Sequence, residues 1–135
     1  MNRAIAESHA TIQPHHLERS AYVYVRQSSL RQVAEHLESQ RRQYERVDWA
    51  IASGWPRERV EVIDEDQGKS GATAKVRPGF ARLLSAVAQG EVGIVIALEV
   101  TRLSRNSPDW HQLLYLCRFT ETLIADEHTV YDPQL

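Results

Sequence analysis

The sequence predicts an α/β domain in which helices cover both faces of a mostly parallel sheet of four to five strands. Apolar runs of strand length alternate along the chain with stretches whose apolar residues recur at helical spacing. The longest apolar run, residues 92–98, is apolar on both faces, as expected of a parallel strand that is covered by helices. The length of 135 residues suits one domain with a substantial core. We therefore expect a three-layer α/β/α arrangement.

The first predicted elements follow a polar N-terminal segment. Residues 1–20 contain Pro14 and three of the six histidines, and we expect them to be a flexible leader ahead of a domain at 21–135. Residues 21–26, AYVYVR, are expected to form the first strand. A helix is expected over 33–54, because Gly54 supplies a C-terminal stop and apolar residues share one helical face, namely Val33, Leu37, Tyr44, Val47 and Ile51.

The second part of the chain repeats the alternation of strands and helices. Strands are expected at 60–65, 92–99 and 122–127, with a short fifth strand at 129–132. Helices are expected at 78–90 and 107–121, since Pro78 and Pro108 stand at first turns, where a missing N–H costs nothing. Cys117 lies among leucines in the last of these helices, and we expect it to belong to the core.

Composition restricts the class of protein. The single cysteine excludes an internal disulfide and favours a reducing cytoplasm, and no apolar run approaches the roughly 20 residues of a membrane helix. The net charge of −2 is unusual for a free-standing nucleic-acid-binding module. Arginine is nevertheless strongly preferred to lysine, with fourteen against two. Both a phosphate-binding role and genomic base composition would explain that bias.

Charged and hydroxyl side chains follow three of the predicted strands. Ligands of open α/β sheets bind outside the carboxyl ends of the strands, so we expect these side chains to meet. Four guanidinium groups at one edge repel each other unless an anion lies between them, and phosphate is the expected anion. A serine would then be the attacking group, with no metal or other cofactor required. The residues concerned are Arg26, Ser28, Asp64, Asp66, Arg77, Arg102 and Arg105.

Simpler interpretations remain open for several of these residues. A strand-end arginine on its own more often solvates the start of a helix, and Asp64 and Asp66 are equally explained as turn residues. The stretch GKSG at 68–71 imitates the end of a nucleotide-binding P-loop. That motif requires a glycine where this chain has Ile63, so no nucleotide is expected. His15 and His16 lack partners at metal-ligand spacing, and we expect no metal there.

Five blocks in order resemble the catalytic domain of serine recombinases: YVRQS (24–28), ESQRRQY (38–44), DEDQGKSG (64–71), RPGF (77–80) and TRLSR (101–105). That family contains resolvases, DNA invertases, and large phage-type integrases and transposases, and the pattern here is closest to the large members. The resemblance covers residues 21–133. It implies a resolvase-like sandwich whose last strand is antiparallel to the rest of the sheet.

The resemblance also implies roles for individual residues. Ser28 would be the nucleophile that forms a phosphoserine link to a DNA end, and Arg26 would contact the scissile phosphate. Small resolvases carry an acid where this chain has Thr101, so no proton-transfer role can be assigned at that position. The remaining site residues implied are Arg77, Arg102 and Arg105 in the phosphate-binding cluster, with Gln40, Asp64 or Asp66, and Ser70 in support.

Two functions follow as hypotheses. The first is a bacterial, nucleoid-associated recombinase domain that cuts and rejoins DNA by transesterification, acting as a homodimer or tetramer in the full-length protein. The second is a truncated, non-catalytic remnant, since the dimerisation helix and DNA-binding domain that follow in the family are absent from these 135 residues. On either view we expect the chain alone to be inactive. A phosphatase-like phosphate site is a weaker third interpretation.

Overall fold

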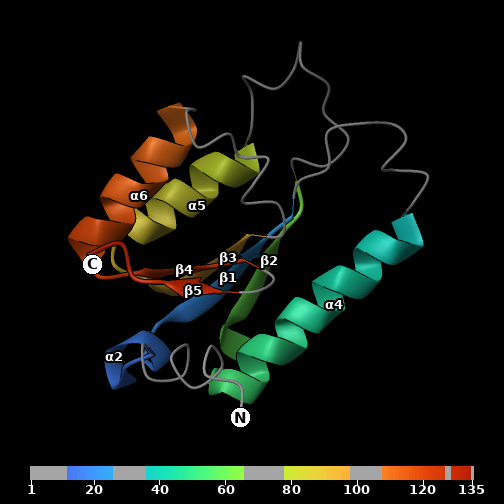
Figure 1. Cartoon of the computed structure of the whole chain (residues 1–135). Coiled ribbons are helices and arrows are strands. Elements are labelled where there is room, and N and C mark those ends of the chain that lie inside the picture. Colours follow the sequence, from blue (N-terminus) through green and yellow to red (C-terminus); the bar gives the residue numbers. More distant parts are fainter. Residues whose placement is uncertain (1–11, 26–35, 66–77, 98–107, 127–128, 135) are drawn as a thin grey trace.

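The computed structural model describes residues 12–25, 36–65, 78–97, 108–126 and 129–134, with the backbone alone at 36–40 and at Arg42. Its centre is a five-stranded sheet in the order β2-β1-β3-β4-β5 (Figure 1). The first four strands are parallel, and β5 pairs antiparallel to β4. The predicted sheet, including its antiparallel last strand, is confirmed. The strands are β1 (Ser20–Tyr24), β2 (Val60–Ile63), β3 (Val92–Ala97), β4 (Leu123–Ala125) and β5 (Val130–Tyr131).

Helices cover both faces of this sheet, which confirms the three-layer arrangement (Figure 1). One face carries α4, and the other carries α5 and α6. Gly54 follows α4 with φ of +127°, a conformation that glycine adopts readily, so its predicted role as a helix stop is confirmed. The helices are α2 (Pro14–Leu17), α4 (His36–Ser53), the 3-10 helix η1 (Arg57–Arg59), α5 (Pro78–Ala88) and α6 (Pro108–Thr120).

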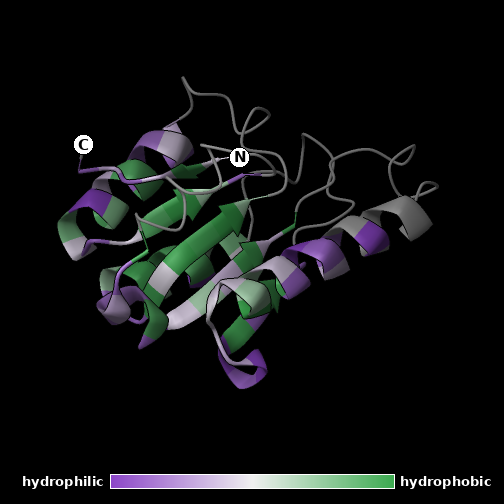
Figure 2. Ribbon diagram, turned by 60° about the horizontal axis from the view of Figure 1, so that its bottom comes forward, coloured by the Kyte–Doolittle hydropathy of each residue, from purple (hydrophilic) through white to green (hydrophobic). Residues whose placement is uncertain are grey.

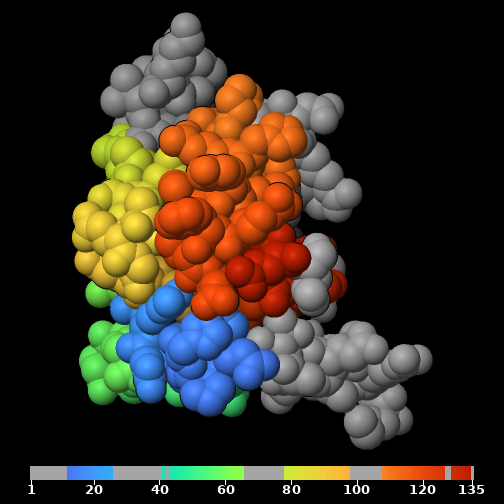
Figure 3. Space-filling model, turned by 90° about the vertical axis from the view of Figure 1, so that its left-hand side faces the viewer, coloured from blue at the N-terminus to red at the C-terminus, as the bar shows by residue number. Residues whose placement is uncertain are grey.

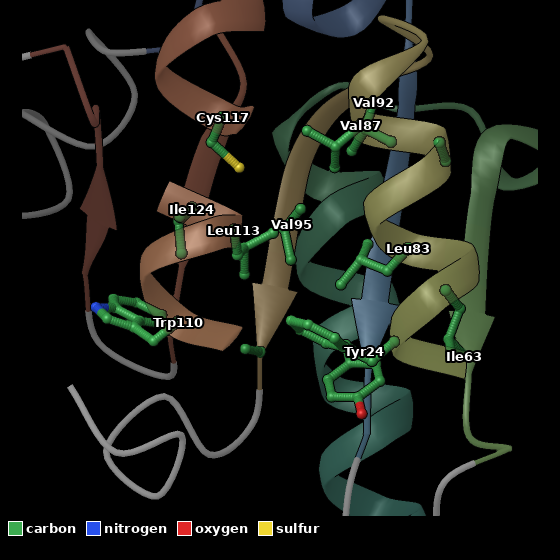
Figure 4. Close-up of a cluster of buried hydrophobic side chains, with 13 residues drawn as sticks. Tyr24, Ile63, Leu83, Val87, Val92, Val95, Trp110, Leu113, Cys117 and Ile124 are labelled. Carbon is green, nitrogen blue, oxygen red and sulfur yellow. The ribbon is translucent and has the colours of Figure 1, made fainter. Parts of the chain in front are cut away.

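Apolar side chains fill both spaces between sheet and helices. All six residues of β3 are buried, as predicted for a central parallel strand. Figure 4 shows Leu83 and Val87 of α5 and Leu113 and Cys117 of α6 directed toward the strands. On the opposite face, α4 has a much more hydrophilic surface (Figure 2). Cys117 is fully buried, which confirms the expectation that it belongs to the core.

The predicted apolar face of α4 is wrong in two places. Tyr44 is 66% exposed and Ile51 is 40% exposed, whereas Val47 and Ala50 are buried. The buried face is centred between Val47 and Ala50, and at 3.6 residues per turn Tyr44 and Ile51 lie about 70–90° away from that centre. Few residues of α4 therefore contact the sheet. Trp55, just beyond the end of α4, is buried and adds apolar surface to the same core.

The predicted flexible leader is wrong for residues 12–20. Ser20 belongs to β1, and residues 12–19, called the N-terminal clasp here, pack against the amino end of the sheet, below α6 in Figure 3. Ile12 and Leu17 contact the core beneath α4, and His16 is buried. A segment with so few apolar residues is held in part by hydrogen bonds to other parts of the chain. Residues 1–11 of the predicted leader lie outside the described part.

Hydrogen bonds tie the clasp to three other parts of the chain. The indole Nε1 of Trp55 donates to the His16 carbonyl over 3.0 Å, and the His16 ring lies 3.0 Å from the Glu121 carbonyl. The guanidinium groups of Arg59 and Arg19 donate to the carbonyls of Leu17 and Thr120 at 2.6 Å and 2.7 Å. Buried polar groups contribute to stability only when paired in this way.

Gly93 in β3 provides a test of the clasp. A Cβ atom at Gly93 would collide with the His16 carbonyl, which also accepts the Trp55 bond. We predict that Gly93→Ala lowers the free energy of unfolding by about 3 kcal/mol or more, because backbone must move to make room. Gly90→Ala is the control, since no atom lies within 4 Å of the added carbon. Its cost should be only the strain of about 1 kcal/mol at positive φ. Equal costs in urea denaturation would contradict the packing described.

His16 gives the fold a pH dependence. Its Nδ1 accepts the Gln13 N–H, so the ring proton lies on Nε2 and donates to Glu121. Burial, followed by the nearby charge of His15, lowers the pKa of His16 below 6.5. The unfolded chain therefore binds this proton at higher pH than the folded chain, and stability falls as the pH drops below about 6.5. The loss is complete once folded His16 is also protonated.

The His16→Gln variant, neutral at every pH, should show a flatter dependence between pH 7.5 and 5.5 in urea denaturation. Parallel curves for the two proteins would contradict the lowered pKa of His16.

Candidate active site at the carboxyl edge of the sheet

Three parallel strands end side by side at one edge of the sheet. Tyr24, the last residue of β1, pairs with Ile63 on one side and with Ala97 on the other, and these are the last residues of β2 and β3. The Val25 N–H extends the ladder by donating to the Ile63 carbonyl over 2.9 Å. The chain consequently leaves β1, β2 and β3 at the same edge, where a ligand of an open α/β sheet binds.

Most of the predicted site residues belong to the segments that follow these strands. Asp64 is described, and it is exposed directly after β2. Gln40 lies in α4, where the backbone alone is described. The other predicted residues lie outside the described residues: Arg26, Ser28, Asp66, Ser70, Arg77, Arg102 and Arg105.

Helix N-termini surround the same edge. The first turns of α4, α5 and α6 lie on the side of the sheet where β1, β2 and β3 end (Figure 1). Proline occupies the first position of α5 and of α6, where its missing N–H leaves no intrahelical bond unmade. Helix N-termini carry partial positive charge and favour a bound anion. The first turns of these helices thus provide a positive electrostatic potential at this edge, which favours the binding of phosphate.

Aromatic side chains pack together at the carboxyl ends of the strands. The rings of Tyr24 and Phe80 pack edge to face, with centroids 5.8 Å apart and an interplanar angle of 63°. Figure 4 shows the Tyr24 hydroxyl directed past the end of β1, and the ring of Trp110 projecting from the first turn of α6. Tyr24 and Phe80 belong to the YVRQS and RPGF blocks, so this contact joins two sequence blocks that are far apart in the chain.

An ion pair at the edge escaped the sequence prediction. The guanidinium of Arg82 donates from Nε to Glu65 Oε2 over 3.2 Å and from Nη2 to Glu65 Oε1 over 2.6 Å. The hydrogen bond to Glu65 is the largest cause of the raised pKa of Arg82. The two residues are separated in sequence by a whole segment, and neither motif nor periodicity marks them as partners.

Three further findings concern metal ligands, the cysteine thiol and the helices of the described residues. That part of the chain contains no group of three or more histidine, cysteine, aspartate or glutamate side chains able to hold a metal ion. Burial raises the pKa of the Cys117 thiol to about 12, so the thiolate is scarce at neutral pH. Across the described ranges, no helix is both long enough and apolar enough to cross a bilayer.

Comparisons with known proteins agree with the sequence blocks. The family model described as "Resolvase, N terminal domain" matches residues 21–133. An uncharacterized protein of Sinorhizobium fredii, y4bA/y4pH, is 59% identical over 118 residues. That alignment covers 87% of this chain and 17% of the relative, so the chain spans a small part of the relative's length. No solved structure matches the chain.

Phe80 tests how firmly α5 is held at this edge. Phe80→Ala removes the edge-to-face contact with Tyr24 and leaves a cavity, which should lower the free energy of unfolding by about 3–5 kcal/mol. Ala81 is the matched control, because it is exposed on the same turn of α5. Ala81→Gly should cost only about 1 kcal/mol of helix propensity. The importance of the Tyr24–Phe80 contact would be contradicted if chemical denaturation gave similar losses of unfolding free energy for both variants.

Proposed function

The chain belongs to the resolvase family of serine recombinases, and from this premise we propose that it cleaves and rejoins DNA by transesterification through Ser28. The observation that carries the proposal is the common edge of β1, β2 and β3. Each of the three segments that contain the predicted serine and arginines follows one of these strands. Parallel strands with coincident ends are the arrangement that would bring such segments to one phosphate.

The proposed reaction exchanges one phosphodiester for another. The Ser28 Oγ attacks the scissile phosphorus, the bond from phosphorus to the deoxyribose 3′ oxygen breaks, and the 5′ phosphate becomes linked to the serine. The proton of the hydroxyl is lost, and the 3′ oxygen leaves as a hydroxyl. Attack by a 3′ hydroxyl on the phosphoserine reverses these steps and rejoins the DNA. Since the phosphodiester energy is retained in the covalent link, neither ATP nor a metal is required.

Positive charge stabilises the transition state in this proposal. The phosphorus becomes pentacoordinate and gains negative charge, which Arg26, Arg77, Arg102 and Arg105 would balance. The N-termini of α5 and α6 add partial positive charge at the same edge. Carboxylates would orient the arginines, and Asp64 stands exposed at the end of β2 in a position that supports such a role for it or for Asp66.

Partners are proposed from the family. We infer that DNA is the substrate and that cutting both strands requires a homodimer or tetramer of the full-length protein. The described edge supports the phosphate contact, and target choice and assembly are proposed for the full-length protein. A role in DNA integration or in a mobile element fits this chemistry.

Ser28→Ala tests the proposal. In the intact recombinase, incubated with supercoiled DNA that carries its recombination sites, this variant should form covalent protein–DNA adducts at least about a thousandfold less than wild type. DNA binding should persist, because the arginines are unchanged. Adducts are counted after denaturation in detergent, which leaves only covalent links.

Ser29→Ala is the matched control, since it removes the neighbouring hydroxyl and leaves Ser28 in place. It should retain adduct formation. Adducts that survive Ser28→Ala, or that disappear with Ser29→Ala, would assign the nucleophile elsewhere.

A further inference from the structure

Two adjacent histidines lie at the centre of the N-terminal clasp. The rings of His15 and His16 are in contact, with centroids 4.0 Å apart and an interplanar angle of 43°. His16 is buried, and its carbonyl lies against β3 at Gly93. The family match covers residues 21–133, so the clasp precedes the matched part of the chain. The histidine pair is therefore a feature of this chain that membership of the family does not explain.

The contacts of His16 suit a neutral ring. Its Nδ1 accepts the Gln13 N–H over 2.9 Å, and its Nε2 donates to the Glu121 carbonyl over 3.0 Å. A second proton would have to occupy Nδ1, where it would face the Gln13 N–H and leave that donor without its acceptor. Protonation of His16 thus removes a hydrogen bond of the clasp and places a charge in a buried position.

The surroundings of His15 disfavour a charge for a different reason. Its Nε2 is shielded from solvent, and among the described residues this atom has no hydrogen-bond partner. Both ring nitrogens of a charged histidine carry a proton, so the charged form would bury an N–H without an acceptor. Two positive rings 4.0 Å apart would also repel each other. Charge on either ring therefore favours a conformation in which the clasp has left the sheet.

The charged groups around His16 do not remove this effect. Arg19, in the clasp itself, opposes a charge on His16, whereas Asp132, beyond β5, favours one. The end of α6 contributes the Glu121 carbonyl, η1 contributes the Arg59 guanidinium, which donates to a clasp carbonyl, and β3 contributes apolar residues and glycine. Burial is the largest influence on the pKa of His16, and this pKa is lowered.

We propose that His15 and His16 form an acid-sensitive latch, whose protonation releases the clasp from the amino edge while the sheet stays folded. The clasp precedes β1 and contributes no strand to the described sheet, so its release breaks no strand pairing. Segments of this kind can open without global unfolding. Release would uncover the Trp55 indole, which donates to the His16 carbonyl, and the backbone of β3 at Gly93. The latch thus couples exposure of part of the core to pH.

Hydrogen exchange measured by NMR at pH 7.5 and 5.5 tests the latch. Each observed rate is compared with the intrinsic rate at the same pH, which gives a protection factor. The reporters of the clasp are the amides of Leu17 and Glu18 and the indole N–H of Trp55, and the amides of β3 report global unfolding. Protection of the clasp should fall by about tenfold or more at the lower pH, and should there lie at least about a hundredfold below that of β3.

Two results for the wild-type chain would overturn the proposal. Equal protection of the clasp and of β3 would mean that the clasp opens only when the whole domain unfolds. Protection of the clasp that does not change with pH would mean that the histidines do not control its release.

His15→Gln tests the role of the paired rings. It removes one of the two charges and leaves the hydrogen bonds of His16 in place, so the fall in clasp protection should shrink to about threefold or less. His111→Gln is the matched control, because His111 is exposed on α6, and it should show the same fall as wild type. A fall of wild-type size in His15→Gln, or an equally reduced fall in His111→Gln, would overturn the assignment of the latch to this pair.

Discussion

The pairing of β1 with β2 on one side and β3 on the other is the constraint on which the rest of the structure depends. It places Tyr24, Ile63 and Ala97 in line, so that three exits from the sheet share one edge. A sheet of this kind is buried on both faces and requires a helix between successive strands. The same requirement sets α4, α5 and α6 around the sheet and brings the N-terminal turns of these helices to the edge where the strands end.

The sequence predicted those parts of the fold that depend on local signals. Proline at helix starts, glycine at helix ends and a doubly apolar strand marked the elements within a few residues. The N-terminal clasp was missed because hydrogen bonds from Trp55, Arg59 and Arg19 hold it, and such bonds leave no apolar periodicity. The Glu65–Arg82 pair was missed for a related reason, since its partners meet only after the sheet has formed. The site blocks were recognisable from sequence, whereas Ser28 and its arginines remain predictions.

The surplus of arginine now has a partial explanation in the fold. A guanidinium offers several N–H donors in a fixed fork, which suits carbonyls left over at helix and strand ends. Arg82 instead forms an ion pair with the Glu65 carboxylate, at the edge of the sheet where the site is proposed. Several described arginines donate to backbone carbonyls in other parts of the chain: Arg19, Arg46, Arg59 and Arg118. Phosphate binding and structural use of arginine are therefore compatible in one domain, and the bias alone does not distinguish them.

The clasp makes the domain mechanically unequal at its two ends. One carbonyl, that of His16, lies against β3 at Gly93 and accepts the Trp55 bond, while the ring of the same residue reaches the end of α6 at Glu121. Three chain segments are thus fastened at one point of the amino edge, by one buried hydrogen bond, one half-buried hydrogen bond and the packing of β3 against the His16 carbonyl. A pull applied to the domain would be carried by this fastened end. At the described carboxyl edge, in contrast, the contacts named above are the packing of Tyr24 on Phe80 and the exposed pair of Glu65 and Arg82.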